Sequence, residues 1–501
     1  MIKRRKSGKG DEFLMGKKRE QRMRKTLALT VALAMAVLLS ACTLTSGKGG
    51  QQVGNLDRET EGTLKVAYFD EQAFHLQYGN AFTAMFPNVT IEVVPLRSVM
   101  NASDPLAELE ALVNEQQPDV LFLTEDEYAY LASKGQLYDL EPIVKQDDYE
   151  LDDFHPAVVE LLKAHGGGKL LGLSPSFSSQ VLYYNKSLFE AHGVPYPTDR
   201  MSWEEALQLA ARFPVKKDGS DALYGLAASA ESGDLFGLVR KIGAAKGLSY
   251  VDADGTALVI DTPEWKEVFQ AVVDGYKSGA VAIPEDNGRG GPGIAVRLVG
   301  GRNAFQTTQD AMKFLQGKAA MAVGGPFVMN MLGLSSGGAA AARSVSGSGG
   351  EEAPPLSGGF EWDVVTLPVD PMYPDVTDGI GLDSIFSIHA ASGNVPLAWE
   401  FLKYANGEQL AKTSGRTGPE LSSRVAYKKE IEGKNMEAFY ALGVNEQLLL
   451  ERLPDGFTAS FSKLASEQLM QVVNGAVSLD DALRTLQSQG QDLLTQAGLN
   501  E

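Results

Sequence analysis

Three short apolar segments in the first part of this chain alternate with helical stretches, and this alternation restricts the fold more than any other feature. The segments are Thr63 to Phe69, Val89 to Val94 and Asp119 to Thr124, and a helical pattern from about Ala73 to Phe86 separates the first two. This spacing is typical of βαβ units, whose strands run parallel and whose helices cover both faces of the sheet. Ligands of such sheets bind beyond the carboxyl ends of the strands. We therefore expect an α/β fold with a site at these ends.

A single cysteine limits how the chain can be stabilised. Cys42 is the only cysteine among 501 residues, so the chain forms no internal disulfide and no thiolate metal site. Stability has to come from burial of apolar surface, which about 440 residues can provide as two domains. The five histidines show no metal-ligand spacing, and we expect neither a metal site nor another cofactor.

The segment before Cys42 has the organisation of an export signal. Basic residues between Lys17 and Lys25 precede an apolar core from Leu27 to Leu39, which at thirteen residues is too short to span a bilayer core of about 30 Å. Leu39-Ser-Ala-Cys42 resembles the lipobox of bacterial lipoproteins, which implies cleavage before Cys42 and a lipid on its sulfur. We predict a signal peptide over residues 1–42, and three methionines fit as its start: Met1, Met15 and Met23.

Without residues 1–42 the chain is strongly acidic. These residues contain eleven Lys/Arg and three Asp/Glu, so the remainder has 34 basic and 61 acidic residues and a formal net charge of about −27, against −19 for the whole chain. Such a surface repels phosphate backbones and anionic headgroups. We expect no nucleic-acid binding, and contact with a membrane only through the lipid anchor.

Two segments lack the periodicity of folded elements. Residues 43–60 are rich in Gly, Gln and Ser, which is typical of a flexible tether. Residues 333–359 are rich in Gly, Ser and Ala, a composition that predicts a loop without a packed core. The globular part should therefore begin near residue 61.

A group of motifs in the middle of the chain occurs in a defined order. The apolar segment Val181-Leu-Tyr-Tyr-Asn185 suits a strand that leaves one domain and enters another. It is followed by Gly193-Val-Pro-Tyr-Pro197 and by Ser202-Trp-Glu-Glu205, whose serine and last glutamate form a capping box that starts a helix. Further along, Gly317-Lys-Ala-Ala-Met321 leads to Gly325-Pro-Phe327.

Together with Trp362-Asp-Val-Val-Thr-Leu-Pro-Val369, these motifs resemble the bacterial extracellular solute-binding proteins of ABC importers, the group that includes maltose- and oligosaccharide-binding proteins. The resemblance covers roughly residues 61 to 501. It implies a two-lobe periplasmic-binding-protein-like fold of type II, in which each lobe is a mixed sheet flanked by helices and the ligand cleft lies between the lobes. The predicted segments are 61–182 with 369–425 for lobe 1 and 183–366 with 426–501 for lobe 2, joined near Val181-Leu-Tyr-Tyr184 and Val364-Val-Thr-Leu367.

The same resemblance implies a function. We expect a lipid-anchored receptor that captures a mono- or oligosaccharide by lobe closure and delivers it to the transmembrane permease of an ABC importer. It would act as a monomer on the extracellular face of the cell membrane of a Gram-positive-type bacterium, because a lipid tether retains a receptor where no outer membrane does. A receptor of the same fold for a non-sugar solute, or one that serves a sensor kinase, is an alternative.

Candidate ligand-binding residues follow from the strand ends and the crossovers. A sugar presents hydroxyl edges and weakly apolar C–H faces, so its receptor needs carboxylates or amides and aromatic rings. The candidates that combine these chemistries with such positions are Phe69, Asp70, Glu125, Asp126, Phe177, Ser178, Phe327, Asp378 and Gly379. By resemblance, Asp126, Ser178 and Phe327 match ligand-contacting positions of oligosaccharide-binding relatives. Phe327 stands where many relatives have Trp, which keeps an aromatic face and removes the indole N–H.

Enzymatic motifs are weak in this sequence. Gly333-Leu-Ser-Ser-Gly337 fits a nucleophile elbow in form but lies in the low-complexity segment, without the strand, turn and helix that such an elbow needs. Gly288-Arg-Gly-Gly-Pro-Gly293 fits a dinucleotide fingerprint but follows no strand. We expect no enzymatic activity, and a lipid-anchored carbohydrate hydrolase is the alternative that these residues favour least.

Overall fold

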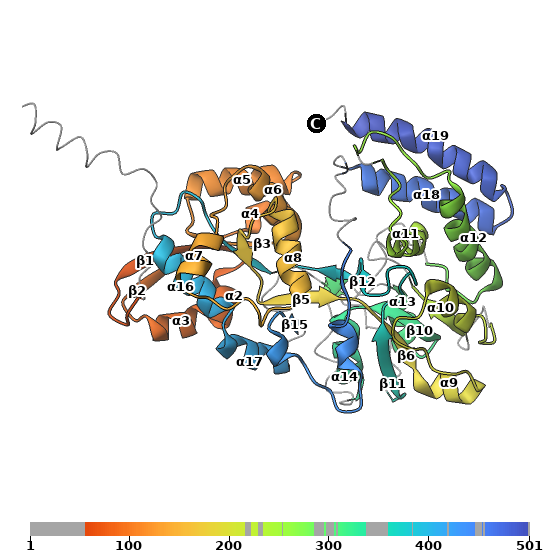
Figure 1. Cartoon of the computed structure of the whole chain (residues 1–501), viewed down its shortest axis with the longest axis horizontal. Coiled ribbons are helices and arrows are strands. Elements are labelled where there is room, and N and C mark those ends of the chain that lie inside the picture. The colour runs from red at the N-terminus through yellow and green to blue at the C-terminus, as the bar shows by residue number, and fades with distance from the viewer. Residues whose placement is uncertain are drawn as a thin grey trace, which may run out of the picture. The chain divides into compact units, whose positions relative to one another are not determined.

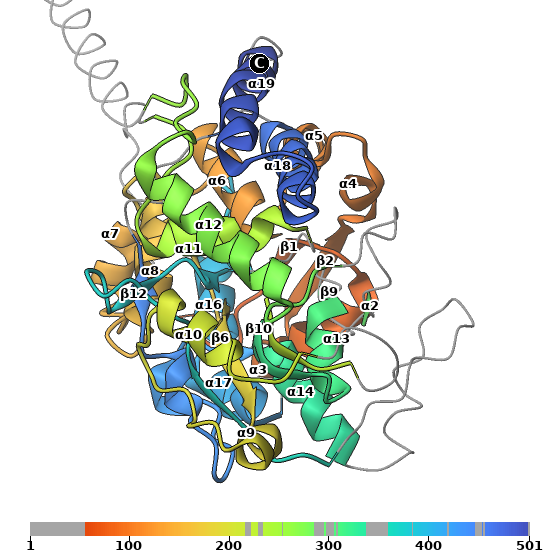
Figure 2. The same ribbon diagram turned by 90° about the vertical axis from the view of Figure 1, so that its right-hand side faces the viewer.

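The computed structural model describes residues 56–498, apart from gaps at 216–221, 229–233, 253, 285–294, 297–304, 307–308, 337–358, 383, 418–419, 446–452 and 454–455. The predicted signal peptide, Cys42 and most of the predicted tether lie outside the described residues. Figures 1 and 2 show the arrangement of the elements in two perpendicular views.

A five-stranded sheet contains the three strands predicted near the start of the globular part. Its order is β2-β1-β3-β14-β4, and the strands are β1 (Gly62–Tyr68), β2 (Val89–Pro95), β3 (Val120–Leu123), β4 (Gly172–Leu173) and β14 (Ile385–Ile388). β1 runs parallel to β2 and β3, whereas β14 runs antiparallel to β3 and β4. All four residues of β3 are buried, as in a strand covered on both faces. The predicted strands are confirmed, and the sheet is mixed.

Helices from two distant parts of the chain surround this sheet (Figure 1). The first group is α4 (Arg97–Asn101), α5 (Pro105–Gln116), α6 (Glu125–Ser133), α7 (Glu141–Gln146) and α8 (Pro156–His165). The second group, α16 (Val395–Ala405) and α17 (Glu408–Thr417), comes almost 300 residues later. Phe401 of α16 packs against Phe74, Phe82 and Phe386, so the late helix completes the core of a sheet that begins at residue 62.

The helical stretch predicted after β1 contains a π-turn. α2 (Glu71–Phe74) continues into η1 (His75–Gly79) and then into α3 (Asn80–Met85). Gly79 has no room for a side chain, because an added Cβ atom would lie 2.5 Å from Nδ1 of His75. Turns of this kind occur frequently at functional sites because they change the direction of the side chains that follow.

A four-stranded sheet forms the centre of the other half of the chain. Its order is β11-β6-β10-β7, and the strands are β6 (Val181–Asn185), β7 (Tyr224–Ala227), β10 (Ala319–Gly324) and β11 (Trp362–Thr366). β6 pairs antiparallel with β10 and with β11, and β10 runs parallel to β7. The two predicted crossover segments therefore lie side by side, with Val364 opposite Tyr183.

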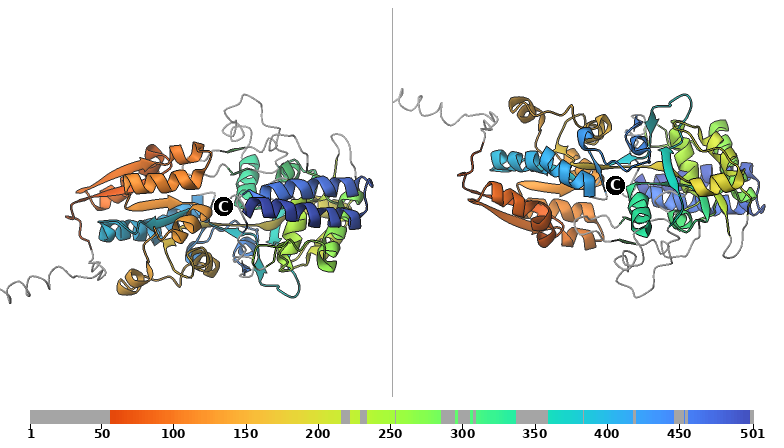
Figure 3. Two further views of the ribbon diagram at one scale, coloured as in Figure 1. Left: turned by 90° about the horizontal axis from the view of Figure 1, so that it is seen from above. Right: turned by 90° about the horizontal axis from the view of Figure 1, so that it is seen from below.

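Helices of the second half pack around this sheet. They are α9 (Lys186–His192), α10 (Trp203–Ala210), α11 (Phe236–Ala245), α12 (Pro263–Ser278), α13 (Gln309–Leu315), α14 (Pro326–Ser336), α18 (Phe457–Val473) and α19 (Leu479–Gly498). α18 and α19 run side by side, as both views of Figure 3 show, and they contact α12. Their core contains Trp203, Phe236, Trp265, Phe269 and Phe461.

The helix predicted from the Ser202-Trp-Glu-Glu205 motif is confirmed together with its cap. Ser202 Oγ accepts a hydrogen bond from the Glu205 N–H at 3.1 Å, and the Glu205 carboxylate accepts one from the Ser202 N–H at 2.8 Å. Trp203, the first residue of α10, is buried. The capping box thus fixes both the start of the helix and the direction in which its tryptophan points.

A small antiparallel sheet lies next to the point where the chain passes from the first large sheet to the second. Its order is β13-β5-β15, with β5 (Ser176–Ser179), β13 (Ile380–Gly381) and β15 (Leu421–Ser422). One residue, Gln180, separates β5 from β6. Two-stranded pairs elsewhere are β12 (Val376–Thr377) with β16 (Gly443–Val444), and β8 (Ala295–Val296) with β9 (Phe305–Gln306).

Two predicted boundaries can be compared with the observed elements, and the lobe limits themselves stay a prediction. The loop predicted over residues 333–359 begins too early, because α14 continues to Ser336, and residues 337–358 lie outside the described part of the chain. The predicted end of the first segment of lobe 1, residue 182, falls two residues after the change of sheet at Gln180. Hydrogen bonding between strands, which composition does not reveal, sets the position of the change of sheet.

Candidate functional site

The predicted site residues at the ends of β1 and β3 follow neighbouring parallel strands. Phe69 and Asp70 come directly after β1, and Glu125 and Asp126 are the first residues of α6, one residue after β3. Because the carboxyl ends of parallel strands share one edge of the sheet, the structure places these four residues at the same edge.

Asp70 has structural partners for both carboxylate oxygens. Oδ1 accepts a hydrogen bond from the Ala73 N–H at 3.1 Å and so caps α2. Oδ2 accepts one at 3.2 Å from Arg97, whose side chain is largely exposed. Phe69 is half-buried, and its ring centroid lies 4.5 Å from that of Tyr68. These contacts hold the chain where it leaves β1.

Glu125 joins three elements. Its Oε2 accepts a hydrogen bond from the Leu382 N–H at 2.8 Å, and its Oε1 lies 2.9 Å from Nε2 of His165, the last residue of α8. The hydrogen bond with Glu125 raises the pKa of His165, and this effect outweighs the burial of the imidazole, which lowers the pKa. Glu125 therefore fixes the start of α6 against α8 and against the segment after β13.

Asp126 differs from its neighbour in exposure. Its side chain is exposed, and within the described part of the chain its carboxylate forms no hydrogen bond. The position follows from the helix start: Thr124 caps α6 through a capping box with Glu127, which turns Glu125 towards Leu382 and leaves Asp126 on the open side. Asp126 thus presents an exposed carboxylate at the edge that it shares with Glu125.

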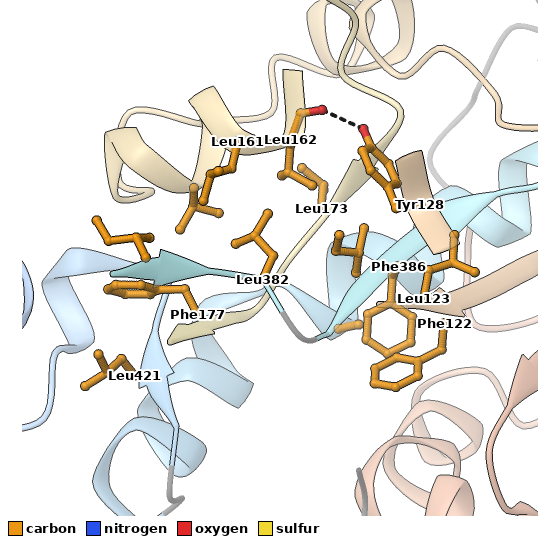
Figure 4. Close-up of a cluster of buried hydrophobic side chains, with 14 of the residues drawn as sticks. Phe122, Leu123, Tyr128, Leu161, Leu162, Leu173, Phe177, Leu382, Phe386 and Leu421 are labelled. Carbon is orange, nitrogen blue, oxygen red and sulfur yellow. Dashed lines mark hydrogen bonds between the residues drawn. The ribbon is translucent and has the colours of Figure 1, made fainter. Parts of the chain in front are cut away.

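β5 separates two predicted site residues onto opposite faces. Phe177 is buried between His155 and Tyr440, with ring centroids 5.1 and 5.3 Å away, and it lies among apolar side chains in Figure 4. Ser178 points to the other face, where its Oγ donates a hydrogen bond to the Gly381 carbonyl at 3.2 Å. Alternation along a strand explains the difference. Ser178 thus shares a face with Gly381 and Glu125, whereas Phe177 packs into the interior.

That polar face of the small sheet carries four half-buried side chains, which we call the polar row: Glu125, Ser178, Ser176 and Glu420. Gly381 lies opposite Ser178, and a Cβ atom added to it would lie 3.3 Å from Ser178 Oγ and 3.8 Å from Glu125 Oε2. On the same face, towards the neighbouring strand β15, Ser176 Oγ donates a hydrogen bond to Glu420 Oε2 at 2.6 Å. The row therefore crosses all three strands.

Phe327 lies at the start of α14, next to the crossover. The turn before it follows β10, whose last residue Gly324 pairs with Val181, and a Cβ atom on Gly325 would lie 3.7 Å from the Ser179 carbonyl. Phe327 itself is 8% exposed. The predicted aromatic residue is thus close in the fold to the strand that carries Ser178.

Asp378 and Gly379 belong to the second crossover. The Gly379 carbonyl accepts a hydrogen bond from the Gln180 N–H at 2.8 Å, and Gly379 is buried, whereas Asp378 is exposed. Gln180 also accepts a hydrogen bond from the buried Lys241 of α11. The two crossovers are therefore tied to each other, and through Lys241 to a helix that packs on the second sheet.

Sequence reasoning missed Ser176, Glu420 and His165. Ser176 was open to prediction, because Ser-Phe-Ser-Ser alternates polar and apolar residues and so predicts one polar face. Glu420 could not be predicted, because it lies next to β5 only through the pairing of the two-residue strand β15, more than 200 residues later in the sequence. His165 carried no local signal of its contact with Glu125.

Comparison with known proteins places this architecture. The family model of bacterial extracellular solute-binding proteins matches residues 59–412. The chain belongs to this family. Its members are solute-binding proteins rather than enzymes, and the chain is accordingly an extracellular solute-binding protein of the kind that serves ABC transporters.

Solved structures of the same fold bind or transport sugars. They include an ABC substrate-binding protein from Listeria monocytogenes in complex with cycloalternan (17% identity, TM-score 0.55, covering 86% of this chain and 99% of that one). A sugar transporter protein from Rhizobium etli has 20% identity and a TM-score of 0.57, over 86% and 99% of the two chains. The sugar-binding protein MalE from Xanthomonas citri has 16% identity and a TM-score of 0.60, over 87% and 98%. The structural likeness over nearly the whole of these chains confirms the type II periplasmic-binding-protein fold that the sequence predicted.

Membrane-spanning helices and metal sites are two further features on which the described residues bear. None of the helices in this part of the chain has the length and apolar character needed to cross a membrane. Over the same residues, no group of three or more His, Cys, Asp or Glu side chains is arranged to hold a metal ion.

Proposed function

We propose that this protein is a lipid-anchored receptor that captures a carbohydrate between two lobes and delivers it to the permease of an ABC importer. Family membership supports capture of a solute and partnership with a permease. The polar row is the observation that carries the carbohydrate assignment. It brings carboxylates and hydroxyls together on β5 and its neighbours, and the turn that bears Phe327 approaches the Ser179 carbonyl of the same strand; sugar hydroxyls and C–H faces require polar groups and an aromatic face.

The proposed binding residues differ in what they contribute. Asp126 and Asp378 supply exposed carboxylates, Ser178 supplies a hydroxyl, and Phe327 supplies an aromatic face. Glu125 and Asp70 position the ends of the strands through their hydrogen bonds and ion pairs. Phe69, Phe177 and Gly379 shape the surrounding backbone and core.

The two paired crossovers support a hinge. β6 and β11 pair with each other in one sheet and β5 and β13 in the next, so the chain passes twice between sheets at adjacent points. A solute that contacts both lobes stabilises the closed state by its differential affinity for that state. In this proposal the lobes have the boundaries given by the sequence, with the first change of lobe at Gln180.

The anchor is part of the proposal. Cleavage before Cys42 and lipidation of its sulfur would hold the monomeric receptor on the outer face of the cell membrane of a Gram-positive-type bacterium. A flexible tether keeps a receptor at high local concentration beside its permease.

A thermal-shift screen of the protein from residue 43 tests the carbohydrate assignment. A ligand present at 100 times its Kd stabilises by about 2.7 kcal/mol. We expect at least one mono- or oligosaccharide to raise the Tm. Asp126→Ala should weaken its binding with little loss of stability, whereas Phe327→Ala should weaken its binding and also lower the Tm, because the ring is largely buried. If peptides, polyamines or metal ions shift the Tm and no sugar does, the assignment is wrong. Unchanged affinity in both variants would overturn the site.

A further inference from the structure

Glu420 occupies an unusual position in the polar row. It comes directly before β15, and the register of β15 with β5 places it opposite Ser178, on the same face as Gly381. In antiparallel sheets, residues opposite each other share a face, so Gly381, Ser178 and Glu420 form a line across the three strands. Glu125 adjoins one end of this line and Glu420 forms the other.

Only one of the two carboxyl oxygens of Glu420 has a partner among the side chains that the structure describes. Oε2 accepts the hydrogen bond from Ser176, whereas Oε1 forms no hydrogen bond to this part of the chain. None of the ion pairs formed by described side chains involves Glu420. A half-buried carboxylate without a cation is costly to maintain unless another group compensates it.

The surroundings of Glu420 show that its charge acts in this region of the fold. Burial is the main cause of the raised pKa of Tyr78, and the charge of Glu420 adds to it. Burial also raises the pKa of Glu420 itself, against the opposing hydrogen bond from Ser176. Tyr78 belongs to the π-turn, where its hydroxyl accepts a hydrogen bond from Gln77. The charge of Glu420 therefore acts on Tyr78 of the π-turn, in addition to the hydrogen bond that Glu420 accepts from Ser176 of β5.

We propose that Glu420 contacts the solute directly, accepting hydrogen bonds from its hydroxyl or ammonium groups, and that with Glu125 it makes the receptor select neutral or cationic sugars over anionic ones. This inference rests on the proposed carbohydrate function and names the class of sugar. Two carboxylates at the ends of one short row repel a third, because unit charges a few ångströms apart in a partly desolvated site interact strongly. A hydroxyl or ammonium group instead supplies the donor that Oε1 lacks.

The experiment compares sugars that differ only in charge. The probes are cellobiose, its uronate cellobiouronic acid and the diamine chitobiose, together with maltose and maltobiouronic acid, each titrated calorimetrically at pH 7.5 and low salt. Within the cellobiose series or the maltose series, we expect the neutral disaccharide to bind at least tenfold more tightly than its uronate.

Glu420→Gln is the decisive variant, because the amide oxygen can still accept the hydrogen bond from Ser176. For each pair of sugars we compare the Kd of the uronate with the Kd of the neutral sugar. We expect Glu420→Gln to reduce the ratio of these two constants about tenfold, which corresponds to about 1.4 kcal/mol. Glu115→Gln is the matched control: it removes the same charge from an exposed position near the end of α5, and the ratio should not change.

The outcomes separate the two proposals. The carbohydrate function itself fails if none of the probes of the cellobiose and maltose series binds and none of the sugars in a broader neutral panel binds. If uronates bind as tightly as neutral sugars, or if Glu420→Gln leaves the ratio unchanged, the role of Glu420 fails while the carbohydrate function stands. Should Glu420→Gln not fold, Glu420→Asp provides the test: it keeps the charge but withdraws the carboxyl by one methylene. Neutral-sugar affinity should then fall at least fivefold, and unchanged affinity overturns the proposed contact.

Discussion

Replacing Gly381 with alanine tests whether the polar row faces the solute. The added methyl carbon would lie 3.3 Å from Ser178 Oγ and 3.8 Å from Glu125 Oε2, and no other heavy atom of the described residues, its chain neighbours aside, would lie within 4 Å. The first contact is tight, but a serine hydroxyl can rotate away. The φ angle of Gly381 is not in the left-handed region, so alanine adopts this backbone without strain. The substitution therefore puts a methyl group on the polar face and leaves the core intact.

The expected effects on stability and on binding differ in size. Loss of a Ser178 hydrogen bond and crowding of the solute cost about 2–3 kcal/mol together, which weakens binding roughly 30- to 150-fold. Stability should change by less than about 1 kcal/mol, because a compatible Gly→Ala change also restricts the unfolded chain. With an unfolding entropy of about 2.1 cal/mol/K per residue over roughly 440 residues, this corresponds to a Tm shift of about 1 °C.

Calorimetry with the sugar that gives the largest stabilisation in the screen measures the first effect, and thermal unfolding without sugar measures the second. Gly393→Ala is the control, since Gly393 is exposed, does not belong to the polar row, and an added Cβ atom there meets no atom of the described residues within 4 Å. Affinity within threefold of the wild type in Gly381→Ala would refute the assignment of this face to the solute. A Tm lowered by many degrees would instead refute the expectation that an alanine side chain fits at position 381 without disturbing the fold.

Three further predictions concern pH, packing and the anchor. Because the pKa of His165 is raised, its ion pair with Glu125 contributes its full stability below the unfolded pKa of about 6.5, and this contribution is lost as the pH rises through the folded pKa. His165→Gln should therefore lower the free energy of unfolding in urea by about 1 kcal/mol at pH 5.5 and by less at pH 8. An equal loss at both pH values would contradict this. Arg424→Lys should lower the free energy of unfolding by about 2–3 kcal/mol, because one ammonium cannot replace the guanidinium contacts to Asp153, Tyr149 and the Asn406 carbonyl. As a control, Arg97→Lys, in an exposed ion pair with Asp70, should lower it by less than about 0.5 kcal/mol. Cys42→Ala should release the protein into the medium with its sugar affinity intact; retention in washed membranes would contradict the lipid anchor.

Local patterns predicted the elements that local interactions determine. The apolar runs after residue 62 form β1, β2 and β3, and the capping box at Ser202 starts α10 as expected. The ends of β1 and β3 carry the expected residues at one edge, since parallel pairing follows from the βαβ pattern.

The orientation of side chains at the site depends on contacts that no local pattern contains. Phe177 and Ser178 are neighbours in sequence, but only the packing of His155 and Tyr440 decides which face of β5 is buried. Glu125 is held by Leu382, more than 250 residues away, and Asp126 is left exposed as a result. The site residues could be listed from the sequence, whereas their separate roles could not.

The position of β14 has a consequence for how this protein is made. β14 lies between β3 and β4 and forms the only link between them in the sheet order, yet it comes from residues 385–388. The first sheet therefore stays incomplete until nearly four-fifths of the chain has been synthesised, and its closure has to await contacts of large sequence separation. A chain bound for the outside of the cell benefits from this delay, since it remains unfolded, and able to pass through an export channel, until its late segments have followed.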